Sequence, residues 1–215
     1  MARSKENFEH KKEEIIKVAL KLFVEKSYEN TTINNIMEAS NVSKGGMYHY
    51  FASKEDILND CLDYITKQDY IRFEEIIKNT SLTAIDKLLK VIIVGSEKPE
   101  NIQKVVDYAQ INLNSIFGYR IKKLSLELTS DCLDKIIQQG IQEGTFHTEY
   151  PKEMAEFCCY AGGFLYDNIF PQKTIEEYEK KLNAYLCVIE KCLGIEEGIL
   201  STSKKALISQ FEAYV

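Results

Sequence analysis

Apolar side chains recur at intervals of three and four residues along nearly the whole chain, and this spacing constrains the fold more than any other feature. The interval matches one face of an α-helix, and no segment shows the alternation typical of a half-buried strand. The 215 residues include only 3 Pro and 10 Gly, too few for the many tight turns of a sandwich or barrel. With 45% hydrophobic residues, the chain can fill a sizeable core. The sequence therefore predicts an all-α fold.

The predicted helices are short at the amino terminus and longer afterwards. A helix is expected over residues 10–26, and a second one, capped by Thr31 or Thr32, stops near Asn41. Ser43 is expected to cap a third helix over residues 44–51. The run Ser53-Lys54-Glu55-Asp56 resembles a capping box and opens a fourth helix that reaches about residue 77. Further helices are predicted to begin at Thr83 and Pro99 and to cover residues 119–139, 151–170, 175–193 and 204–214, with a turn region at Gly140 and Gly144.

Charge is distributed unevenly along the chain. The net charge is −6, but residues 1–54 hold 9 basic and 7 acidic residues, which gives +2, whereas residues 55–215 hold 18 and 26, which gives −8. The larger part would repel a polyanion such as DNA. Any contact with DNA is therefore expected within residues 1–54, and we divide the chain into domains over residues 1–54 and 55–215.

The sequence shows no pattern typical of an enzyme or a metal site. Its six cysteines lack the spacing of zinc ligands or of a compact disulfide framework, so we interpret them as reduced thiols that pack as small hydrophobic groups. The three histidines are scattered, and no Ser or Cys nucleophile has a recognisable histidine partner. We expect no metal, no cofactor and no catalysis. No stretch approaches the ~20 apolar residues of a membrane span, and no secretory signal is recognised, so a cytoplasmic protein without membrane contact is expected.

The predicted third helix has two different faces. Met47, Tyr50 and Phe51 fall at i, i+3 and i+4 and are expected to face the core. Two short helices joined by a three-residue turn form a helix-turn-helix, whose second helix enters the ~12 Å major groove of DNA. Two glycines cost such a helix roughly 1 kcal/mol each, which close approach to DNA would explain; the alternative is that they mark a loop. The exposed face is predicted to carry Lys44, Gly45, Tyr48 and His49.

The run from Tyr28 to Leu58, YENTTINNIMEASNVSKGGMYHYFASKEDIL, resembles the signature of the TetR family of transcriptional regulators. That signature is approximately Thr-Thr-hydrophobic before the first helix of the motif, Gly-Val-Ser in the turn, Gly-x-Leu-Tyr-x-Tyr-Phe in the recognition helix and Ser-Lys-Glu after it. Gly46 makes base preference hard to infer, because Thr or Ser is frequent there. The other departures are Ser27 and Asn41 in place of Gly, Met37 in place of a small residue, and Met47 in place of Leu.

The resemblance implies which side chains meet DNA. Thr31 or Thr32, Tyr48 and Lys54 would contact phosphates, and the residues at or near the groove would be Ser43, Lys44, Gly45, Gly46 and His49. The chemistry agrees, since lysine supplies a point charge, tyrosine a hydroxyl and histidine one or two donors. For His49 the alternative is a solvated surface histidine. Lys5, Lys11 and Lys12 either attract phosphates or form a solvated charge run.

One recognition helix reads too few base pairs for selective binding, so a homodimer on palindromic double-stranded DNA is expected. In the family the last two large helices form a four-helix dimer interface. Two apolar stripes on these helices are the candidate interface, and the alternative is that either stripe is ordinary core. The stripes are Met154, Phe157, Cys158, Ala161 and Leu165, and Tyr178, Leu182, Tyr185, Leu186 and Ile189.

The resemblance also implies a small-molecule effector, bound among the central helices, that releases the protein from DNA through the fourth helix. Aromatic and polar residues there would suit an amphipathic, aromatic or cationic ligand. The alternative is that the aromatic residues belong to the core. The candidates are Tyr64, Tyr108, Asn112, Tyr119, Glu127, Tyr160 and Phe164.

The sequence thus predicts a ligand-responsive dimeric transcriptional regulator, most simply a repressor, with an effector-binding and dimerisation domain over residues 55–215. The alternative is a helical small-molecule carrier or protein-interaction module without DNA specificity. Sequence-selective binding to duplex DNA distinguishes the two.

Overall fold

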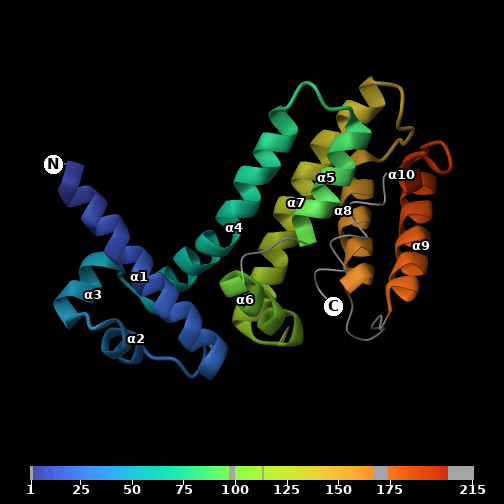
Figure 1. The fold of residues 1–215 in the computed structure, drawn as a ribbon. Helices are drawn as coiled ribbons and strands as arrows, with labels where there is room; N and C mark the ends of the chain where they lie inside the picture. The colour runs from blue at the N-terminus through green and yellow to red at the C-terminus, as the bar shows by residue number, and fades with distance from the viewer. Residues whose placement is uncertain (1, 97–99, 113, 167–173, 203–215) are drawn as a thin grey trace. The chain divides into compact units, whose positions relative to one another are not determined.

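The computed structural model describes residues 2–96, 100–112, 114–166 and 174–202, whose regular structure is entirely helical, with no strand among them (Figure 1). This confirms the all-α fold. Among the helices in these residues, none is both long enough and apolar enough to span a membrane. The helices are α1 (Ala2–Lys26), α2 (Ile33–Ser40), α3 (Lys44–Tyr50), α4 (Lys54–Lys78), α5 (Ala84–Ser96), α6 (Glu100–Ile111), α7 (Ile116–Gln142), α8 (Pro151–Gly162), α9 (Ile175–Leu193) and α10 (Ile199–Thr202), with a 3₁₀ turn at Gly163–Tyr166.

The chain packs into two compact units, each with its own core. The first unit comprises residues 1–68 and 99–125, and the second comprises residues 69–98 and 126–215. The first unit extends beyond residue 54 because α6 and the beginnings of α4 and α7 pack against the amino-terminal helices. The functional boundary after residue 54 stays a prediction.

The core of the first unit forms around one face of α1. Ile15, Ala19 and Phe23 are fully buried there. The ring of Phe23 lies 5.2 Å from that of Tyr28 and 5.4 Å from that of Phe117 on α7, both in edge-to-face geometry. Aromatic packing thus joins α1, the segment after it and the start of α7.

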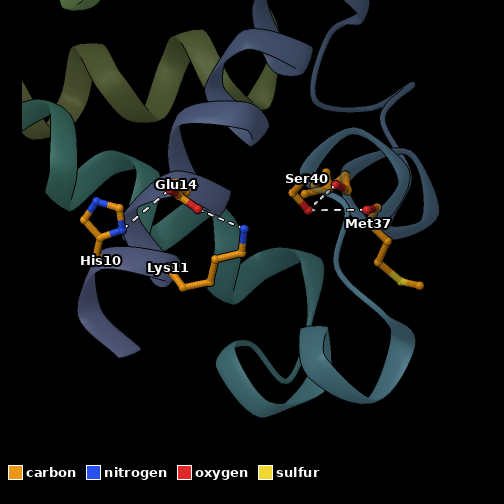
Figure 2. Close-up of polar contacts among 6 residues, drawn as sticks. His10, Lys11, Glu14, Met37 and Ser40 are labelled. Atoms are coloured by element: carbon orange, nitrogen blue, oxygen red, sulfur yellow. Dashed lines mark hydrogen bonds and ion pairs between the residues drawn. The ribbon is translucent and has the colours of Figure 1, made fainter. Parts of the chain in front are cut away.

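The first helix begins earlier than the apolar spacing predicts, at Ala2 instead of residue 10. At the start of the predicted range, polar contacts link neighbouring turns: Glu14 accepts a hydrogen bond from Lys11 at 2.8 Å and lies 3.5 Å from the ring of His10 (Figure 2). Such pairs support solvent-exposed helical turns. The sequence pattern missed residues 2–9 of this helix because few apolar residues mark one face there.

The second unit has a core built from α5, α8, α9 and parts of α4 and α7. The buried amine of Lys87 donates hydrogen bonds to the carbonyl of Ile77 and to Oε1 of Gln139, both at 2.7 Å. Gly140 lies inside α7 instead of in the predicted turn, because the helix continues to Gln142. A side chain at Gly140 would collide with the ring of Phe146.

The later boundaries follow their local signals. α9 covers the predicted residues 175–193, with Thr174 as its amino-terminal cap and Gly194 in a left-handed conformation at its end. α8 stops at Gly162, earlier than predicted. Residues 167–170 of that prediction, and the predicted helix over 204–214, lie outside the described residues.

Candidate nucleic-acid interface

The helix-turn-helix geometry is built by short-range hydrogen bonds around α2. Thr32 caps α2 by accepting from the amide of Asn35 at 3.1 Å, while Oδ1 of Asn35 accepts from the amide of Thr32 at 2.9 Å. At the other end, buried Ser40 donates to the carbonyls of Ile36 and Met37 (Figure 2). Asn41 then takes the left-handed conformation, with φ of 51°, so the chain turns sharply into α3 as predicted.

α3 has the two faces that its sequence predicts. Met47 is 1% exposed, Phe51 directly after the helix is 3% exposed, and Tyr50 is half-buried. Tyr48 is 51% exposed. The whole exposed set on this helix is Lys44, Gly45, Tyr48 and His49, with Gly46 half-buried. The side chains with hydrogen-bonding and charged groups therefore face solvent, where a duplex can reach them.

The two glycines of α3 have different surroundings. Nothing lies within 4 Å of where a Cβ at Gly45 would be. A Cβ at Gly46 would lie 3.1 Å from Cγ1 of Val42 and 3.3 Å from Oγ of Ser43, which caps the helix by accepting from the Gly46 amide. Gly46 therefore relieves crowding in the turn, whereas no crowding around Gly45 in the described part of the chain accounts for that glycine.

The two candidate lysines, Lys44 and Lys54, differ in how accessible their amines are. Lys44 is exposed and has no ion-pair partner among the residues that the structure describes. Nζ of Lys54 lies 4.1 Å from the centre of the Tyr28 ring and 3.4 Å from the carbonyl oxygen of Glu29. Burial lowers the pKa of Lys54, and the nearby Glu29 carboxylate partly offsets this effect. Lys44 is thus the more accessible cation for a phosphate or a base edge.

The two threonines before α2 are not equivalent. Thr31 is fully buried, and its hydroxyl donates to the carbonyls of Ser27 at 2.7 Å and Leu22 at 3.3 Å. This bond closes the end of α1, where Ser27 has a left-handed φ of 68°. Thr32 is exposed at the start of α2. Of the two threonines that the sequence offers, Thr32 therefore has the solvent-accessible side chain, and its contact with a phosphate stays a prediction.

The lysines of α1 are engaged by acidic neighbours. Lys11 pairs with Glu14 at 2.8 Å, and Lys12 pairs with Asp60 of α4 at 2.7 Å. The side chain of Lys5 lies outside the described residues. These pairs favour the interpretation of Lys11 and Lys12 as a locally neutralised surface, since each charge already has a counter-ion.

Long-range contacts join the beginnings of α4 and α7 to each other and to the segment after α1, and no sequence pattern indicated them. Arg120 forms an ion pair with Glu55 and donates to Oδ1 of Asn59 at 2.7 Å. The hydroxyl of Tyr28 donates to Glu55 at 3.1 Å. Glu29 accepts from the amide of Ile116, the first residue of α7, at 3.0 Å. These partners lie tens of residues apart in the chain, so no local pattern links them.

The effector candidates divide between the units. In the first unit, Tyr64 and Tyr108 are half-buried, and the side-chain amide of Asn112 donates to the carbonyl of Tyr108 at 2.9 Å. Tyr119, also in this unit, is 60% exposed. In the second unit Glu127 and Tyr160 are exposed, and the side chain of Phe164 lies outside the described residues. The half-buried candidates with described side chains are thus Tyr64, Tyr108 and Asn112, all in the first unit.

Most of the predicted dimer-interface residues lie in the core of a single chain. Cys158 and Leu165 are each 1% exposed, and all five candidates on α9 are buried, with Tyr185 donating to the carbonyl of Cys158 at 3.4 Å. Met154 and Ala161 are half-buried. Of the predicted interface residues Phe157 remains exposed, at 44%, and the surface of these helices also presents Tyr160, Ile175 and Val188, at 69%, 40% and 43% exposure. Apolar periodicity therefore identified mainly the packed face of these helices, and Phe157 is the predicted residue that stays at the surface.

The described residues contain no cluster of three His, Cys, Asp or Glu side chains that would hold a metal ion. The region around α3 presents hydrogen-bond donors, an exposed cation and an accessible backbone to solvent. These groups suit recognition of a duplex by contact, because phosphates and base edges are read by such donors.

Comparison with known proteins identifies the same region. Residues 15–61 match the sequence model of the bacterial regulatory proteins of the tetR family. The Transposon Tn10 TetC protein of Escherichia coli is 30% identical over 148 residues, which cover 64% of this chain and 69% of that protein. The uncharacterized HTH-type transcriptional regulator YuxN of Bacillus subtilis is 33% identical over 140 residues, 63% of this chain but only 42% of YuxN.

The fold is shared with solved structures. A crystal structure from Syntrophomonas wolfei, described as a TetR-family transcriptional regulator, superposes with a TM-score of 0.68 at 21% identity. The match covers 84% of this chain and 95% of that one. At this identity the likeness concerns the arrangement of helices.

Proposed function

The chain belongs to the TetR family of bacterial regulatory proteins, and from this premise we propose that it is a dimeric repressor that binds a palindromic operator and is released by a small-molecule effector. Its relatives are transcriptional regulators, and the chain is a regulator instead of an enzyme. The identity of the DNA and of the effector, and the assembly itself, belong to the proposal.

The observation that carries the proposal is the exposed face of α3. It presents the amine of Lys44, an open backbone at Gly45 and the hydroxyl of Tyr48, while Met47 on the opposite face anchors the helix in the core. A helix that is fixed on one side and offers donors on the other suits insertion into the major groove. Lys44 and Tyr48 supply phosphate or base contacts, and Thr32 supplies a phosphate contact from the start of α2.

Selection of duplexes from a random or genomic pool tests DNA binding directly. The selected DNA should contain an inverted repeat, and its affinity should fall steeply as salt rises, because lysine contacts release counter-ions from phosphates. In Lys44→Ala combined with Tyr48→Ala we expect affinity to fall, and each phosphate that is no longer bound should reduce the salt slope by about one.

A matched control is Tyr150→Ala combined with Lys180→Ala, which removes an exposed tyrosine and an exposed lysine elsewhere in the chain. This control should bind the operator as the unmodified protein does. Equal affinities for all duplexes, or unchanged binding by the α3 variant, would favour the carrier or protein-interaction alternative.

The dimer is proposed to form on the exposed apolar side chains of α8 and α9. Phe157, Tyr160 and Val188 are large apolar groups left at the surface of helices whose other faces are already packed. Sedimentation equilibrium should show a dimer, and Phe157→Glu combined with Tyr160→Glu should yield a folded monomer that no longer binds the inverted repeat tightly. Tyr70→Glu, at another exposed tyrosine, is the control and should leave the dimer intact.

The effector is proposed to be an amphipathic or aromatic small molecule. Support comes from family membership and from half-buried Tyr64 and Tyr108, the latter beside the amide of Asn112. A thermal-shift screen should find compounds that raise the unfolding temperature. The same compounds should weaken operator binding about 5- to 150-fold, the range of typical allosteric coupling. Ligands that stabilise the protein without changing its DNA affinity would contradict this part of the proposal.

A further inference from the structure

An aromatic residue near the beginning of α1 packs against the end of α3. The ring of Phe8 lies 4.7 Å from the ring of Tyr50, at a tilt of 31°, and 5.3 Å from the ring of His49, in edge-to-face geometry at 87°. Phe8 is half-buried although the residues on either side of it, Asn7 and Glu9, are exposed. A feature of α1 that the apolar spacing did not predict therefore touches the helix proposed to read DNA.

A second contact from the next turn of α1 fixes the same region. Lys12 lies 5.5 Å above the ring of Phe51 and pairs with Asp60 at 2.7 Å. Phe8 and Lys12 are four residues apart, so they lie on one face of α1. The end of α3 is consequently held by α1 at two adjacent points, which makes Phe8 part of a defined surface.

His49 is the side chain whose position depends most on Phe8. It is exposed and has no hydrogen-bond or ion-pair partner among the described residues, so the rings of Phe8 and of Tyr50, 5.6 Å away, are what restrain it. An unrestrained surface side chain loses rotamer freedom when it binds a partner, and prior restraint removes part of that cost. Imidazole must also present a particular nitrogen to a base edge, so its orientation affects which base it accepts.

We propose that Phe8 is a positioning residue for DNA recognition: it holds the imidazole of His49 in the orientation that reads a base, and so contributes to operator selectivity without touching DNA. The inference rests on the proposed function, because it requires that α3 enters the groove. It adds a residue outside the helix-turn-helix to the determinants of sequence preference.

The test compares base preference, beginning from the duplex that the unmodified protein selects. A panel with single base-pair changes in one half-site is measured with the unmodified protein, His49→Ala, Phe8→Ala and the double variant. At the position that His49 reads, His49→Ala should reduce discrimination about fivefold, the lower end of the usual cost of a mismatch. Phe8→Ala should reduce discrimination at the same position, and it should cause no further reduction in the His49→Ala background.

Two further variants separate positioning from stability. Phe8→Leu keeps apolar bulk against Tyr50 but removes the flat ring, so it should retain the unfolding temperature and still lose discrimination. Val18→Ala trims another half-buried apolar residue of α1 and should leave the base panel unchanged. Without DNA, the NMR shifts of the His49 ring protons should move in Phe8→Leu, because the ring current of the neighbouring phenyl group is removed.

Each outcome decides the inference. A uniform loss of affinity for all duplexes in the Phe8 variants, or an equal loss in the presence and absence of His49, would mean that Phe8 only stabilises the fold. An unchanged panel with His49→Ala would show that His49 reads no base, and this result also overturns the inference. Failure of the unmodified protein to select any duplex would instead contradict the proposed function itself.

Discussion

Ser43 and Gly46 are coupled at the start of α3. Oγ of Ser43 accepts a hydrogen bond from the amide of Gly46 at 3.2 Å, and the same oxygen would lie 3.3 Å from a Cβ at that position. The cap satisfies one of the free amides of the first helical turn. Absence of a side chain at Gly46 therefore helps the cap to close, and the reason for this glycine lies inside the protein.

Gly45, unlike Gly46, has no neighbouring atom among the described residues that a methyl group would crowd, so the two positions should respond differently to alanine. Gly45→Ala should stabilise the protein by up to about 1 kcal/mol, because alanine favours a helix and the new methyl group meets no atom. Its affinity for the operator should fall, since the methyl group faces the duplex. Gly46→Ala should stabilise the protein less, because the methyl group crowds Val42 and Ser43.

Urea unfolding and operator titration on the same samples measure both quantities. Ala39→Gly, at an exposed position of α2, is a control for the helix-propensity effect and should lower stability. Unimpaired DNA binding by Gly45→Ala would show that α3 does not approach the groove closely at this position.

Valine substitutions at Thr31 and Thr32 should have different effects on stability and on DNA binding. Thr31→Val removes a buried hydroxyl that serves two backbone carbonyls, so the free energy of unfolding should fall by about 1–3 kcal/mol. The folded fraction should bind DNA normally. Thr32→Val removes an exposed cap, which costs about 1 kcal/mol, and it should also weaken DNA binding. Reversal of these DNA phenotypes would contradict the assignment of Thr32 to the interface.

The pair formed by Tyr28 and Glu55 predicts a loss of stability at high pH. Burial, followed by the hydrogen bond to Glu55, raises the pKa of Tyr28 from 10.0 to about 12. The folded state thus holds the phenolic proton more tightly than the unfolded state. This contribution to stability is fully present below pH 10 and is lost as the pH rises through about 12.

The free energy of unfolding should accordingly fall more steeply between pH 10 and 12 in the unmodified protein than in Tyr28→Phe. At pH 8 the variant should be less stable by about 1 kcal/mol, because it lacks one hydrogen bond. Tyr70→Phe, at an exposed tyrosine, is the control and should follow the unmodified protein. Parallel pH profiles for all three proteins would contradict the role of Tyr28.

The parts of the structure that the sequence predicted depend on neighbouring residues. Asn41 in the turn and Ser43 at the start of α3 act within one or two helical turns, so their residue types suffice to predict them. The buried face of α3 also follows from spacing alone. A one-dimensional pattern is enough wherever the interacting groups are close along the chain.

What the sequence missed depends on segments that meet only after folding. Arg120 finds Glu55 across 65 residues, and Phe8 reaches His49 from another helix. Similarly, the apolar spacing of α9 predicts a buried face but cannot say whether the same chain or a second copy covers it. The sequence could not distinguish Thr31 from Thr32 for the same reason, because burial of the Thr31 hydroxyl depends on how α1 packs.

The buried cysteines provide a last test of the core. Burial raises the pKa of the Cys132 and Cys158 thiols to about 12, and that of Cys61 is raised as well. Alkylation requires the thiolate, so these three residues should react very slowly at pH 8. The half-buried residues Cys159, Cys187 and Cys192 should react first.

Mass spectrometry after brief iodoacetamide treatment identifies the modified residues, and unfolding in urea should expose all six cysteines as the control. The prediction is specific, because the pKa values rise through burial and not chiefly through a charged partner. A variant that loosens the core locally should therefore increase the alkylation of its neighbours alone: Tyr185→Phe removes the hydrogen bond to the Cys158 carbonyl, and it should speed reaction at Cys158 while Cys61, in the other unit, stays protected. Rapid labelling of Cys61 in the folded protein would contradict the packing of α4 against α1, where its thiol lies 3.7 Å from the carbonyl oxygen of Ile16.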